Sequence, residues 1–370
     1  MISSRLFLQP SVLRGSNKRK DMSLYSSKTY IEDLKKAAGS IAASGGISDC
    51  SILITGSTGT VGSFLVDMLL QMNRDQNAGI KVYAASRSYK GFAERFGEVA
   101  GDDLVFAQHD NNAPFAFDMD VDYIIHAAGN AHPDTFNNDP VGTVTGNIMG
   151  TDTLLKYAAS HKVKRFLYIS SGEVYGLGDL SLESFDESYA GYLDPMSPRS
   201  CYPLSKRAAE NLCASYGKQY GIDTVVCRLC HTYGPGMKAG DSRANAAFLR
   251  NVINGEDIVM KSAGSQLRSY NYIADCASAI LTVLLAGKAG EAYNIANPAS
   301  RITIAELAQL IASAAGKKVI FSEPDSADIA KQSPIPKQVL DTKKLEALGW
   351  MGAFGPAEGV GHTIKILRGE

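Results

Sequence analysis

Hydrophobic residues along this chain follow two alternating patterns, which predict strands and helices in turn. Short runs rich in β-branched residues predict strands at 51–55, 80–85, 103–107, 122–126, 165–170 and 223–229. Longer stretches with an apolar residue every three or four positions predict helices at 60–73, 141–160, 202–220 and 242–254. Strands that alternate with helices form right-handed crossovers and a parallel sheet covered on both faces. The chain is therefore expected to be α/β, with a doubly wound parallel sheet.

Three glycines occupy the turn between the first predicted strand and the first predicted helix, at Gly56, Gly59 and Gly62. A strand, a glycine turn and a helix in this order are typical of a site for the phosphates of a dinucleotide. The first glycine allows the tight turn, the second lets backbone N–H groups approach a pyrophosphate, and the third lets helix and strand pack closely. The equal spacing differs from the usual G-x-G-x-x-G fingerprint, but the context favours a Rossmann nucleotide site over a plain glycine-rich loop.

The regions on either side of the alternating part predict a chain of three segments. An amphipathic helix at 28–43 is expected to cover part of the main domain. After residue 235 the order is less regular, with strands predicted near 258–260, 268–273 and 291–294 and a helix at 303–315. The expected segments are an N-terminal extension with its covering helix at 1–47, a dinucleotide-binding Rossmann domain at 48–235, and a smaller C-terminal α/β lobe at 236–370 that mostly binds substrate and interleaves with the main sheet.

Composition narrows the classes of partner. With 370 residues, 45% hydrophobic and 20% charged, the chain has material for a sizeable core. A net charge of −1 gives no concentrated positive field, which argues against nucleic acid as the main partner. No apolar run approaches the roughly 18 residues of a membrane span, so no membrane partner is expected. Six scattered cysteines form no disulfide framework, which favours a reducing compartment and a cytoplasmic location.

Two local patterns have plainer explanations than the ones they first suggest. Residues 1–20 are basic and serine-rich and contain no acid, as transit peptides do. We favour a disordered extension, or an upstream start with Met22 as the usual beginning, over a targeting segment. Residues 227–231 match the haem attachment motif C-x-x-C-H, but they lie in a predicted buried strand. We therefore interpret Cys227 and Cys230 as small core residues.

Tyr202 and Lys206 are the first candidates for chemistry. They lie four residues apart at the start of a predicted helix, hence on one face of it. A nearby ammonium group favours the phenolate, so the sequence predicts a lowered tyrosine pKa, suited to taking a proton from an alcohol. In the plainer alternative, Tyr202 is an ordinary core residue and the aliphatic part of the Lys206 side chain lies along the protein surface. The preceding nucleotide turn favours the catalytic interpretation.

Ser171 and Glu173 follow the predicted strand at 165–170, at the sheet edge where parallel sheets bind ligands. Ser171 is suited to hydrogen bond the reacting oxygen, and Glu173 to act on a neighbouring carbon. In the alternative, the hydroxyl groups at this strand end are hydrogen-bonded within the fold and Glu173 is an exposed surface residue without a catalytic role. The irregular stretch at 176–200 is long for a compact domain, and such connections are often functional, for instance as a lid.

Together, the glycine turn, the Ser171 segment and the Tyr202–Lys206 pair resemble the extended short-chain dehydrogenase/reductase family, the NAD-dependent nucleotide-sugar epimerases, dehydratases and decarboxylases. The resemblance covers about residues 48–320. Within the family the chain resembles the UDP-glucuronate decarboxylases, in the segments 126–128, 147–151, 197–202, 241–243 and 264–272. Glu173 fits this group, because decarboxylases and 4,6-dehydratases carry a glutamate there and plain 4-epimerases usually do not.

The resemblance implies a role for each matching residue. The pyrophosphate of the cofactor would be held by Gly56, Thr58, Gly59, Thr60, Val61 and Gly62. The rest of the cofactor would lie against Asp110 and Asn111 at the adenine, and against Ala127, Ala128, Tyr202 and Lys206. Tyr202 would be the base at the sugar C4 hydroxyl, tuned by Lys206 and oriented by Ser171, with Glu173 also catalytic. Arg243 and Arg268 would grip the substrate diphosphate, where a planar guanidinium suits bidentate contact.

Four departures from the family pattern change this picture. Gly172 stands where 4,6-dehydratases carry an aspartic acid, so loss of the C6 hydroxyl lacks its usual proton donor. His231 replaces a typical asparagine, and either binds substrate or packs. His132 lies in a stretch that is proline-alanine-serine in the decarboxylases, and is a further substrate-binding candidate. The second strand ends at Ser86 and Arg87, with no acid for the ribose hydroxyls, and Arg87 suits a 2′-phosphate.

These observations predict an enzyme that oxidises C4 of a nucleoside-diphosphate sugar transiently, with no metal. Decarboxylation of a UDP-glucuronate-like sugar is the expected outcome, with C4 epimerisation and dehydration as alternatives. A catalytically silent NAD(P)-binding sensor is the alternative of another class. The family implies NAD as cofactor, whereas the end of the second strand favours NADP. The family also implies a homodimer through the helices at 141–160 and 202–220, which the sequence allows.

Overall fold

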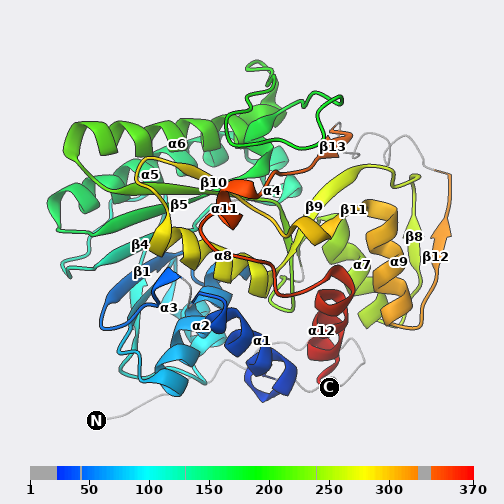
Figure 1. Ribbon diagram of the computed structural model, residues 1–370, viewed down its shortest axis with the longest axis horizontal. Coiled ribbons are helices and arrows are strands. Elements are labelled where there is room, and N and C mark those ends of the chain that lie inside the picture. Colours follow the sequence, from blue (N-terminus) through cyan, green and yellow to red (C-terminus); the bar gives the residue numbers. More distant parts are fainter. Residues whose placement is uncertain (1–22, 42–43, 130, 239, 324–334) are drawn as a thin grey trace, which may run out of the picture.

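The structure is a computed structural model that describes residues 23–41, 44–129, 131–238, 240–323 and 335–370. Figure 1 shows one large sheet with helices on both faces and a smaller lobe beside it. The basic segment at 1–20 and Asn130 lie outside the described residues. Within the described ranges, no helix is both long and apolar enough to cross a lipid bilayer.

Seven parallel strands form the main sheet, in the order β10-β6-β5-β4-β1-β2-β3. Their bounds are β1 Ser51–Thr55, β2 Lys81–Ser86, β3 Leu104–Gln108, β4 Tyr123–His126, β5 Arg165–Ser171, β6 Thr224–Leu229 and β10 Ala292–Ile295. The order runs outward from β1 in one direction and from β4 in the other, so these two strands form a topological switch point, where such sheets bind ligands. The predicted doubly wound parallel sheet is confirmed.

Helices cover both faces of this sheet (Figure 1). The helices on one face are α5 Pro140–Ser160 and α6 Cys201–Tyr220, whose apolar residues share one buried cluster with that face. On the other face, a larger buried cluster includes residues of α2 Thr60–Gln76, α3 Tyr89–Phe96 and α8 Ile273–Ala286. The predicted helices at 60–73, 141–160 and 202–220 are thus present.

The sequence patterns did not predict α8. Every residue from Ile273 to Leu284 is buried, because this helix is covered by the sheet on one side and by α1 and α2 on the other. A helix without a polar face shows no helical period, so its sequence resembles any other buried apolar run. The other helices absent from the prediction are α3, α4 Pro133–Asn138, α11 Lys343–Glu346 and α12 Pro356–Arg368.

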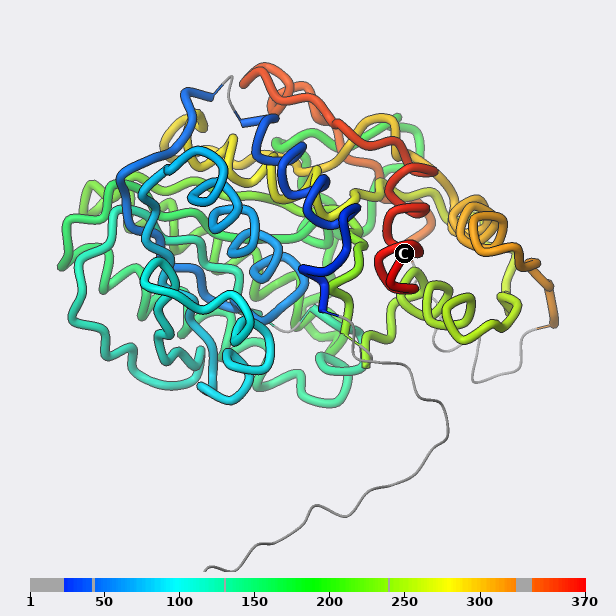
Figure 2. Tube along the Cα trace, turned by 90° about the horizontal axis from the view of Figure 1, so that it is seen from below, coloured from blue at the N-terminus to red at the C-terminus, as the bar shows by residue number. Residues whose placement is uncertain are grey.

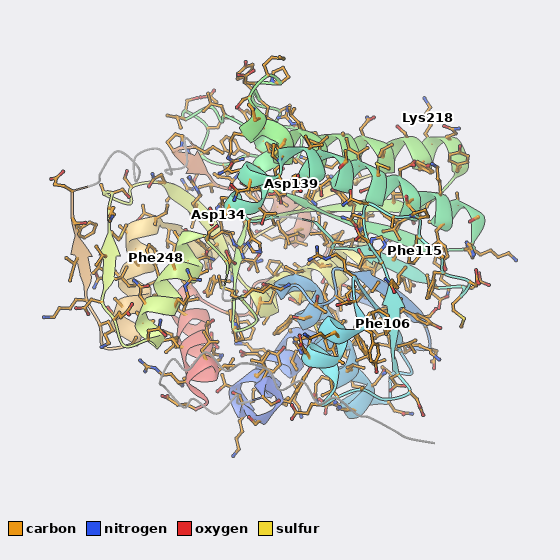
Figure 3. The ribbon with its side chains drawn as sticks, turned by 180° about the vertical axis from the view of Figure 1, so that it is seen from behind. Phe106, Phe115, Asp134, Asp139, Lys218 and Phe248 are labelled. Carbon is orange, nitrogen blue, oxygen red and sulfur yellow. The ribbon has the colours of Figure 1, made fainter. Side chains whose placement is uncertain are left out.

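The smaller lobe is built around β9 Leu267–Tyr272. The strands paired with β9 are β7 His231–Tyr233, β11 Arg301–Thr303 and β13 Lys337–Gln338, while β8 Ile258–Met260 pairs with β12 Val319–Phe321. Its main helices are α7 Ala244–Ile253 and α9 Ile304–Ala314. Figure 3 shows Phe248 of α7 on the opposite side of the molecule from Phe106 of β3. Between α8 and β11 the chain visits the main sheet as β10 and afterwards continues in the smaller lobe. The division at residues 47/48 and 235/236 remains a prediction.

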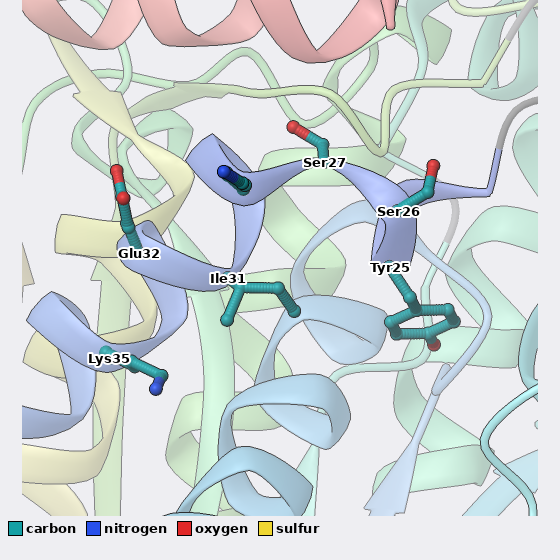
Figure 4. A pocket seen from close by; sticks show the side chains of 7 residues that line it. Tyr25, Ser26, Ser27, Ile31, Glu32 and Lys35 are labelled. Carbon is teal, nitrogen blue, oxygen red and sulfur yellow. The ribbon is translucent and has the colours of Figure 1, made fainter. Parts of the chain in front are cut away.

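The N-terminal helix α1 Lys28–Gly39 joins distant parts of the chain. It packs against α2, α8 and α12, and Figure 2 shows it between α2 and the C-terminal helix. Its Asp33 accepts a hydrogen bond of 2.5 Å from the Tyr272 hydroxyl and lies 2.8 Å from Nδ1 of His362. A shallow hollow of about 290 Å³ is lined by residues 25–28, 31, 32 and 35, which belong to α1 and the turn before it (Figure 4). None of the residues that line this hollow belongs to the glycine turn.

The irregular segment at 176–200 is tied to the body of the protein along its length. Arg207 of α6 donates to Val174 O (2.6 Å) and to Gly191 O (2.8 Å). Arg228 of β6 donates to Glu187 O at 2.8 Å. These bonds anchor the residue just before the segment and the middle of the segment to α6 and β6. Whether it acts as a lid stays a prediction.

Candidate active site

The glycine turn after β1 needs glycine for the reasons that the sequence suggested. Gly56 has a φ of +65°, and a Cβ there would lie 2.7 Å from Ala127 O. A Cβ at Gly62 would lie 2.9 Å from the carbonyl carbon of Gly56, so the first turn of α2 passes directly over the loop. Side chains at either position would displace backbone.

The same turn presents backbone donors toward the switch point. Gly59 precedes α2 and offers no side-chain cap, so the first N–H groups of a helix of 17 residues are left for another acceptor. Thr60 donates from its hydroxyl to Gly236 O at 3.3 Å, and Val61 packs against the core behind the turn. Thr58 lies half-buried between the two glycines Gly56 and Gly59. A pyrophosphate fits a cradle of this kind.

Polar side chains next to the glycine turn link the ends of the neighbouring strands to one another. Thr55 Oγ1 accepts from Ala128 N (3.2 Å) and lies 2.7 Å from Nδ1 of His126. Burial lowers the pKa of His126 well below its usual value, so its ring is neutral. Asn111 donates to Ala128 O at 3.2 Å, and its Oδ1 lies 2.9 Å from Nε2 of His109. The ends of β1, β3 and β4 are therefore linked, and this holds Ala127 and Ala128 against Gly56.

The predicted adenine-binding pair is thus engaged in holding the loop after β3. The Asp110 carboxylate accepts from Asn112 N at 2.9 Å, closing a tight turn. Asn111 fixes Ala128, as described. Sequence reasoning did not find Thr55 or His109, because single polar residues at strand ends carry no motif, and it named His126 only as part of the 126–128 segment.

The catalytic candidates Ser171, Tyr202 and Lys206 meet at the carboxyl end of β5. The Ser171 side chain lies near the Tyr202 hydroxyl, and its own hydroxyl accepts from Glu173 N at 3.2 Å. Lys206 Nζ donates to Ile169 O at 2.8 Å and lies 5.9 Å from the centre of the Tyr202 ring. Both α6 side chains are buried, each 5% exposed. The predicted arrangement on one helix face is present.

The expected lowering of the Tyr202 pKa by Lys206 is wrong for this structure. Burial raises the pKa of Tyr202 to about 12, and the negative charge of Glu173 adds to the increase. The nearby Ser171 side chain and the charges of Arg243 and Arg199 oppose this increase without reversing it. Burial also lowers the pKa of Lys206 to about 8. Desolvation thus outweighs the pairing of two groups that are not in direct contact.

Glu173 forms an ion pair with a neighbouring arginine. Arg199 donates to its carboxylate at 3.1 and 3.4 Å. The Arg199 guanidinium also lies 4.4 Å from the centre of the Phe136 ring, and Phe136 stacks on Tyr202 with ring centres 5.3 Å apart. An ion pair thus lies next to the phenol of Tyr202. The sequence analysis singled out neither Arg199 nor Phe136, although Arg199 lies in the 197–202 segment that carried the resemblance.

Two substrate-binding candidates converge on Asp241. Arg243 donates to both oxygens of this carboxylate, at 2.6 to 3.1 Å, and Nδ1 of His132 lies 3.3 Å from Oδ1. Burial opposes the charge of Asp241, but His132 and Arg243 outweigh it and hold the pKa of that carboxyl well below its usual range. Asp241 therefore joins the segment before α4 to the segment before α7. Sequence reasoning quoted Asp241 only as part of a segment.

The other two candidates lie deeper in the lobe. Burial lowers the pKa of His231 to about 3, and the charges of Arg268 and Arg243 lower it further, so its ring is neutral. Arg268 is 3% exposed, and its two terminal nitrogens donate to Leu267 O and Ile335 O. The predicted contact of Arg268 with a diphosphate therefore requires those bonds to be exchanged.

Ser86 and Arg87 lie at the carboxyl end of β2, beside the glycine turn. Ser57 of the turn donates to Ala85 O from both its backbone N (3.2 Å) and its hydroxyl (3.0 Å). Ser86 is buried and Arg87 is exposed. The cofactor candidates are therefore brought to one edge of the sheet, from β1, β2, β3 and β4.

Comparison with known proteins agrees with this architecture. Residues 52–296 match the NAD dependent epimerase/dehydratase family. The chain is 32% identical to UDP-glucuronic acid decarboxylase 6 of Arabidopsis thaliana, over 82% of this chain and 84% of that protein. It is 30% identical to UDP-glucuronic acid decarboxylase 1 of Xenopus tropicalis, over 86% and 72% of the two chains.

A solved structure has the same fold. It is DesIV, a dTDP-glucose 4,6-dehydratase from Streptomyces venezuelae with NAD and TYD bound. The two chains are 26% identical with a TM-score of 0.72, and the match covers 86% of this chain and 97% of the other. The fold, the match over residues 52–296 and the identity to the decarboxylases agree: this chain belongs to the NAD dependent epimerase/dehydratase family.

Proposed function

We propose that the protein removes the C5 carboxyl group of UDP-glucuronate, or of a closely similar nucleoside-diphosphate sugar, through transient oxidation at C4. The observation that carries the proposal is the buried phenol of Tyr202 at the carboxyl end of β5, with Ser171 and the ion pair Glu173–Arg199 beside it. Relatives that share about 30% of the sequence over most of the chain are UDP-glucuronic acid decarboxylases.

The dinucleotide would be NAD, as in the family, held by the glycine turn and the ends of β1 to β4. When bound, it supplies a hydride acceptor for the sugar C4 and returns the hydride afterwards. Gly56 and Gly62 leave the pyrophosphate room at the backbone, and the free N–H groups at the start of α2 suit its charge. Ala127, Ala128 and Lys206 line the edge of the site next to this turn.

Tyr202 would take the proton of the C4 hydroxyl group. Its phenol is protonated in the protein alone, since its pKa is about 12, so transfer depends on substrate and cofactor entering the site. Ser171 would share the hydrogen bond to the same oxygen. Lys206, with a pKa of about 8, is poised to lose or regain a proton near neutral pH while Ile169 O holds it in place.

Glu173 and Arg199 would serve the neighbouring carbon, C5. A guanidinium group binds a carboxylate in a bidentate way, and Arg199 already does so with Glu173. A substrate carboxylate that competed for Arg199 would free Glu173. A carbonyl group at C4 stabilises the charge left at C5 when carbon dioxide departs, and Glu173 or a water next to it would return a proton there. Gly172 offers no acid for the dehydration of a C6 hydroxyl.

The diphosphate and nucleoside would lie against the smaller lobe. Arg243 is oriented by Asp241 and is 21% exposed in its side chain, so it retains a face for phosphate. His132 and the neutral His231 would contact the sugar, and Arg268 would join if it released its backbone partners. These roles remain proposals for each residue.

Product analysis tests the reaction. Purified protein is incubated separately with UDP-glucuronate, UDP-glucose and dTDP-glucose. Carbon dioxide and a UDP-pentose from the first support the proposal. Conversion of UDP-glucose to UDP-galactose would instead indicate the 4-epimerase alternative, and a keto-deoxy sugar a dehydratase. No turnover of any sugar, with cofactor still bound, would favour the silent sensor.

The proposal includes a cytoplasmic homodimer that forms through α5 and α6. Val141 in the first turn of α5 and Met149 further along it are 71% and 53% exposed, which leaves two apolar side chains of this helix open to a partner. All six cysteines are unpaired and buried, as in proteins of reducing compartments. Light scattering of the wild type against Met149→Glu tests the dimer, which the variant should dissociate.

A further inference from the structure

Phe136 is a buried aromatic residue of the short helix α4, beside the phenol of Tyr202. It is 1% exposed and belongs to a small buried cluster with Cys201 and Tyr202. This cluster is separate from the two larger ones that flank the main sheet. A phenylalanine has no group that transfers a proton, so it can affect a reaction only through the shape and the faces of its ring.

The ring of Phe136 contacts two side chains on which the proposed reaction depends. It stacks on the Tyr202 ring, with an angle of 16° between the ring planes and 5.3 Å between the ring centres. The guanidinium of Arg199 lies over the Phe136 ring, 4.4 Å from its centre. Stacked rings attract each other, and so do a cation and an aromatic face. One apolar side chain therefore joins the phenol proposed for C4 to the guanidinium proposed for C5.

Helix α4 is attached to its surroundings at its middle and at both ends. Cys201 Sγ donates to Phe136 O at 3.6 Å, which links the middle of α4 to the start of α6. His132 is the N-cap of α4, and its Nδ1 lies 3.3 Å from the buried carboxylate of Asp241. Asp139 ends α4 and caps the N-terminus of α5 with its side chain. The position of the Phe136 ring is therefore fixed by three separate parts of the chain.

The contact of Arg199 with the ring differs in kind from its contact with Glu173. Arg199 donates to the Glu173 carboxylate through its N–H groups, at 3.1 and 3.4 Å. The Phe136 ring takes no conventional hydrogen bond, so the N–H groups of Arg199 stay available for carboxylates. Arg199 can therefore exchange Glu173 for the carboxylate of a substrate while its guanidinium remains over the ring.

We propose that Phe136 is a positioning residue: its ring sets the separation between the Tyr202 phenol and the Arg199 guanidinium, so that both reach adjacent carbons of one sugar ring. The inference rests on the proposed function and names the side chain that couples its steps at C4 and C5. The two carbons are bonded neighbours, so the two protein groups must be placed together. A misplacement of about 1 Å in such an arrangement can lower a rate about 100-fold.

Kinetics of carbon dioxide release from UDP-glucuronate test this role. Phe136→Leu keeps a large apolar side chain and removes both ring contacts. We expect kcat to fall about 10-fold or more, and KM to rise about threefold or more because Arg199 is less well placed for the substrate carboxylate. The dissociation constant for NAD⁺ should stay within about twofold, because Phe136 is not part of the glycine turn, and this also shows that the variant is folded.

Two further variants separate positioning from packing. Phe136→Tyr keeps the aromatic ring and should retain kcat within about threefold of the wild type. Phe96→Leu is the matched control, since Phe96 of α3 is also buried and has the guanidinium of Arg95 4.8 Å from its ring centre. Urea denaturation should show a loss of stability in Phe96→Leu similar to that in Phe136→Leu, with kcat and KM within about twofold of the wild type.

Binding without turnover gives a second readout. Affinities for UDP-glucuronate and UDP-glucose are measured by calorimetry in the NAD-loaded Tyr202→Phe protein, with and without Phe136→Leu. The two ligands differ only in the group attached to C5, so the ratio of their affinities reports the placement of Arg199. Phe136→Leu should reduce the preference for UDP-glucuronate about threefold or more, which a general loss of packing would not do.

The inference is overturned if Phe136→Leu retains the kcat, the KM and the affinity ratio of its parent, or if Phe96→Leu shows the same kinetic losses. A wild type that releases no carbon dioxide but interconverts another sugar refutes the proposed decarboxylation alone. The kcat of Phe136→Leu for that sugar then decides whether Phe136 positions Tyr202. A wild type that turns over no sugar overturns both proposals.

Discussion

The two halves of the proposed site, one for the cofactor and one for the substrate, are held in different ways. The cofactor half is shaped by backbone: a glycine turn, three strand ends and a helix N-terminus, with short polar side chains such as Thr55 and Asn111 as ties. The substrate half is held by charged side chains that reach across the chain, such as Arg199 to Glu173 and His132 to Asp241. A cradle made of backbone accepts any ligand with a pyrophosphate, whereas paired charges can be exchanged for a substrate's own charges. The first arrangement gives a general site and the second gives selectivity.

The largest expected effect separates the two halves at Tyr202. Tyr202→Phe should lower kcat for carbon dioxide release by about 10² to 10⁴, the usual contribution of proton transfer. Dinucleotide affinity should stay within about twofold, because the phenol is not part of the cradle. Tyr216→Phe is the control on the same helix, where the hydroxyl binds Asp152 at 2.6 Å. Equal turnover in the wild type and Tyr202→Phe would remove Tyr202 from the chemistry.

Gly62→Ala should damage the cofactor half and spare the other. A methyl group there would lie 2.9 Å from the Gly56 carbonyl carbon, so the turn must shift. We expect dinucleotide affinity to fall about 100-fold or more, with a loss of unfolding free energy of about 1 to 3 kcal/mol. Gly361→Ala in α12 is the control, since nothing lies within 4 Å of the added atom. Unchanged affinity, measured by calorimetry, would show that the turn can relax.

Asp241→Asn should affect the substrate half through KM. The neutral amide loses the charge that orients Arg243 and attracts His132. Because hydrogen bonds between charged groups contribute about 1.5 to 3 kcal/mol, KM for UDP-glucuronate should rise about 10-fold or more, with kcat within about threefold. Arg243→Gln should give the same increase, and the double variant little more. A fall in kcat at constant KM would instead link Asp241 to the chemistry.

The last expected effect is on stability rather than on binding or turnover, and it depends on pH. Lys206 titrates near pH 8 in the folded protein and near 10.5 when unfolded, so below pH 8 its buried charge destabilises the fold. Between pH 8 and 10.5 the unfolded chain binds more protons, and stability rises with pH. At pH 7 the free energy of unfolding of Lys206→Met should therefore exceed that of the wild type by up to about 3 kcal/mol. The difference between the two proteins should be smaller at pH 10. Urea titrations at both pH values measure it. An advantage that does not change with pH would show that Lys206 is neutral throughout.

The same contrast explains how far the sequence could predict the molecule. The alternation of strands and helices and the glycine turn are local patterns, and the sheet, its helices and the cradle followed from them. The partners of charged side chains are not local. Glu173 and Arg199 are 26 residues apart, and His132 and Asp241 lie in different parts of the chain. No spacing rule connects such residues, so their pairing emerged only from the fold.

Burial is the second property that the sequence could not supply. The pKa of Tyr202 was expected to fall because a lysine lies four residues away, yet it rises, because both groups are desolvated. Helix α8 was missed for a related reason, since enclosure on all sides removes the polar face that marks a helix. Both errors come from judging residues by their neighbours in sequence and not by their access to water.

The late return of the chain to its main sheet has a consequence for biosynthesis. Strand β6 ends at Leu229, but its outer partner β10 begins only at Ala292. During translation the outer edge of β6 therefore stays unpaired until residues 230–291 have been made and β10 can form. Unpaired strand edges can pair with other chains. A nascent chain whose synthesis stops between β6 and β10 should therefore bind chaperones and precipitate more readily than the complete chain.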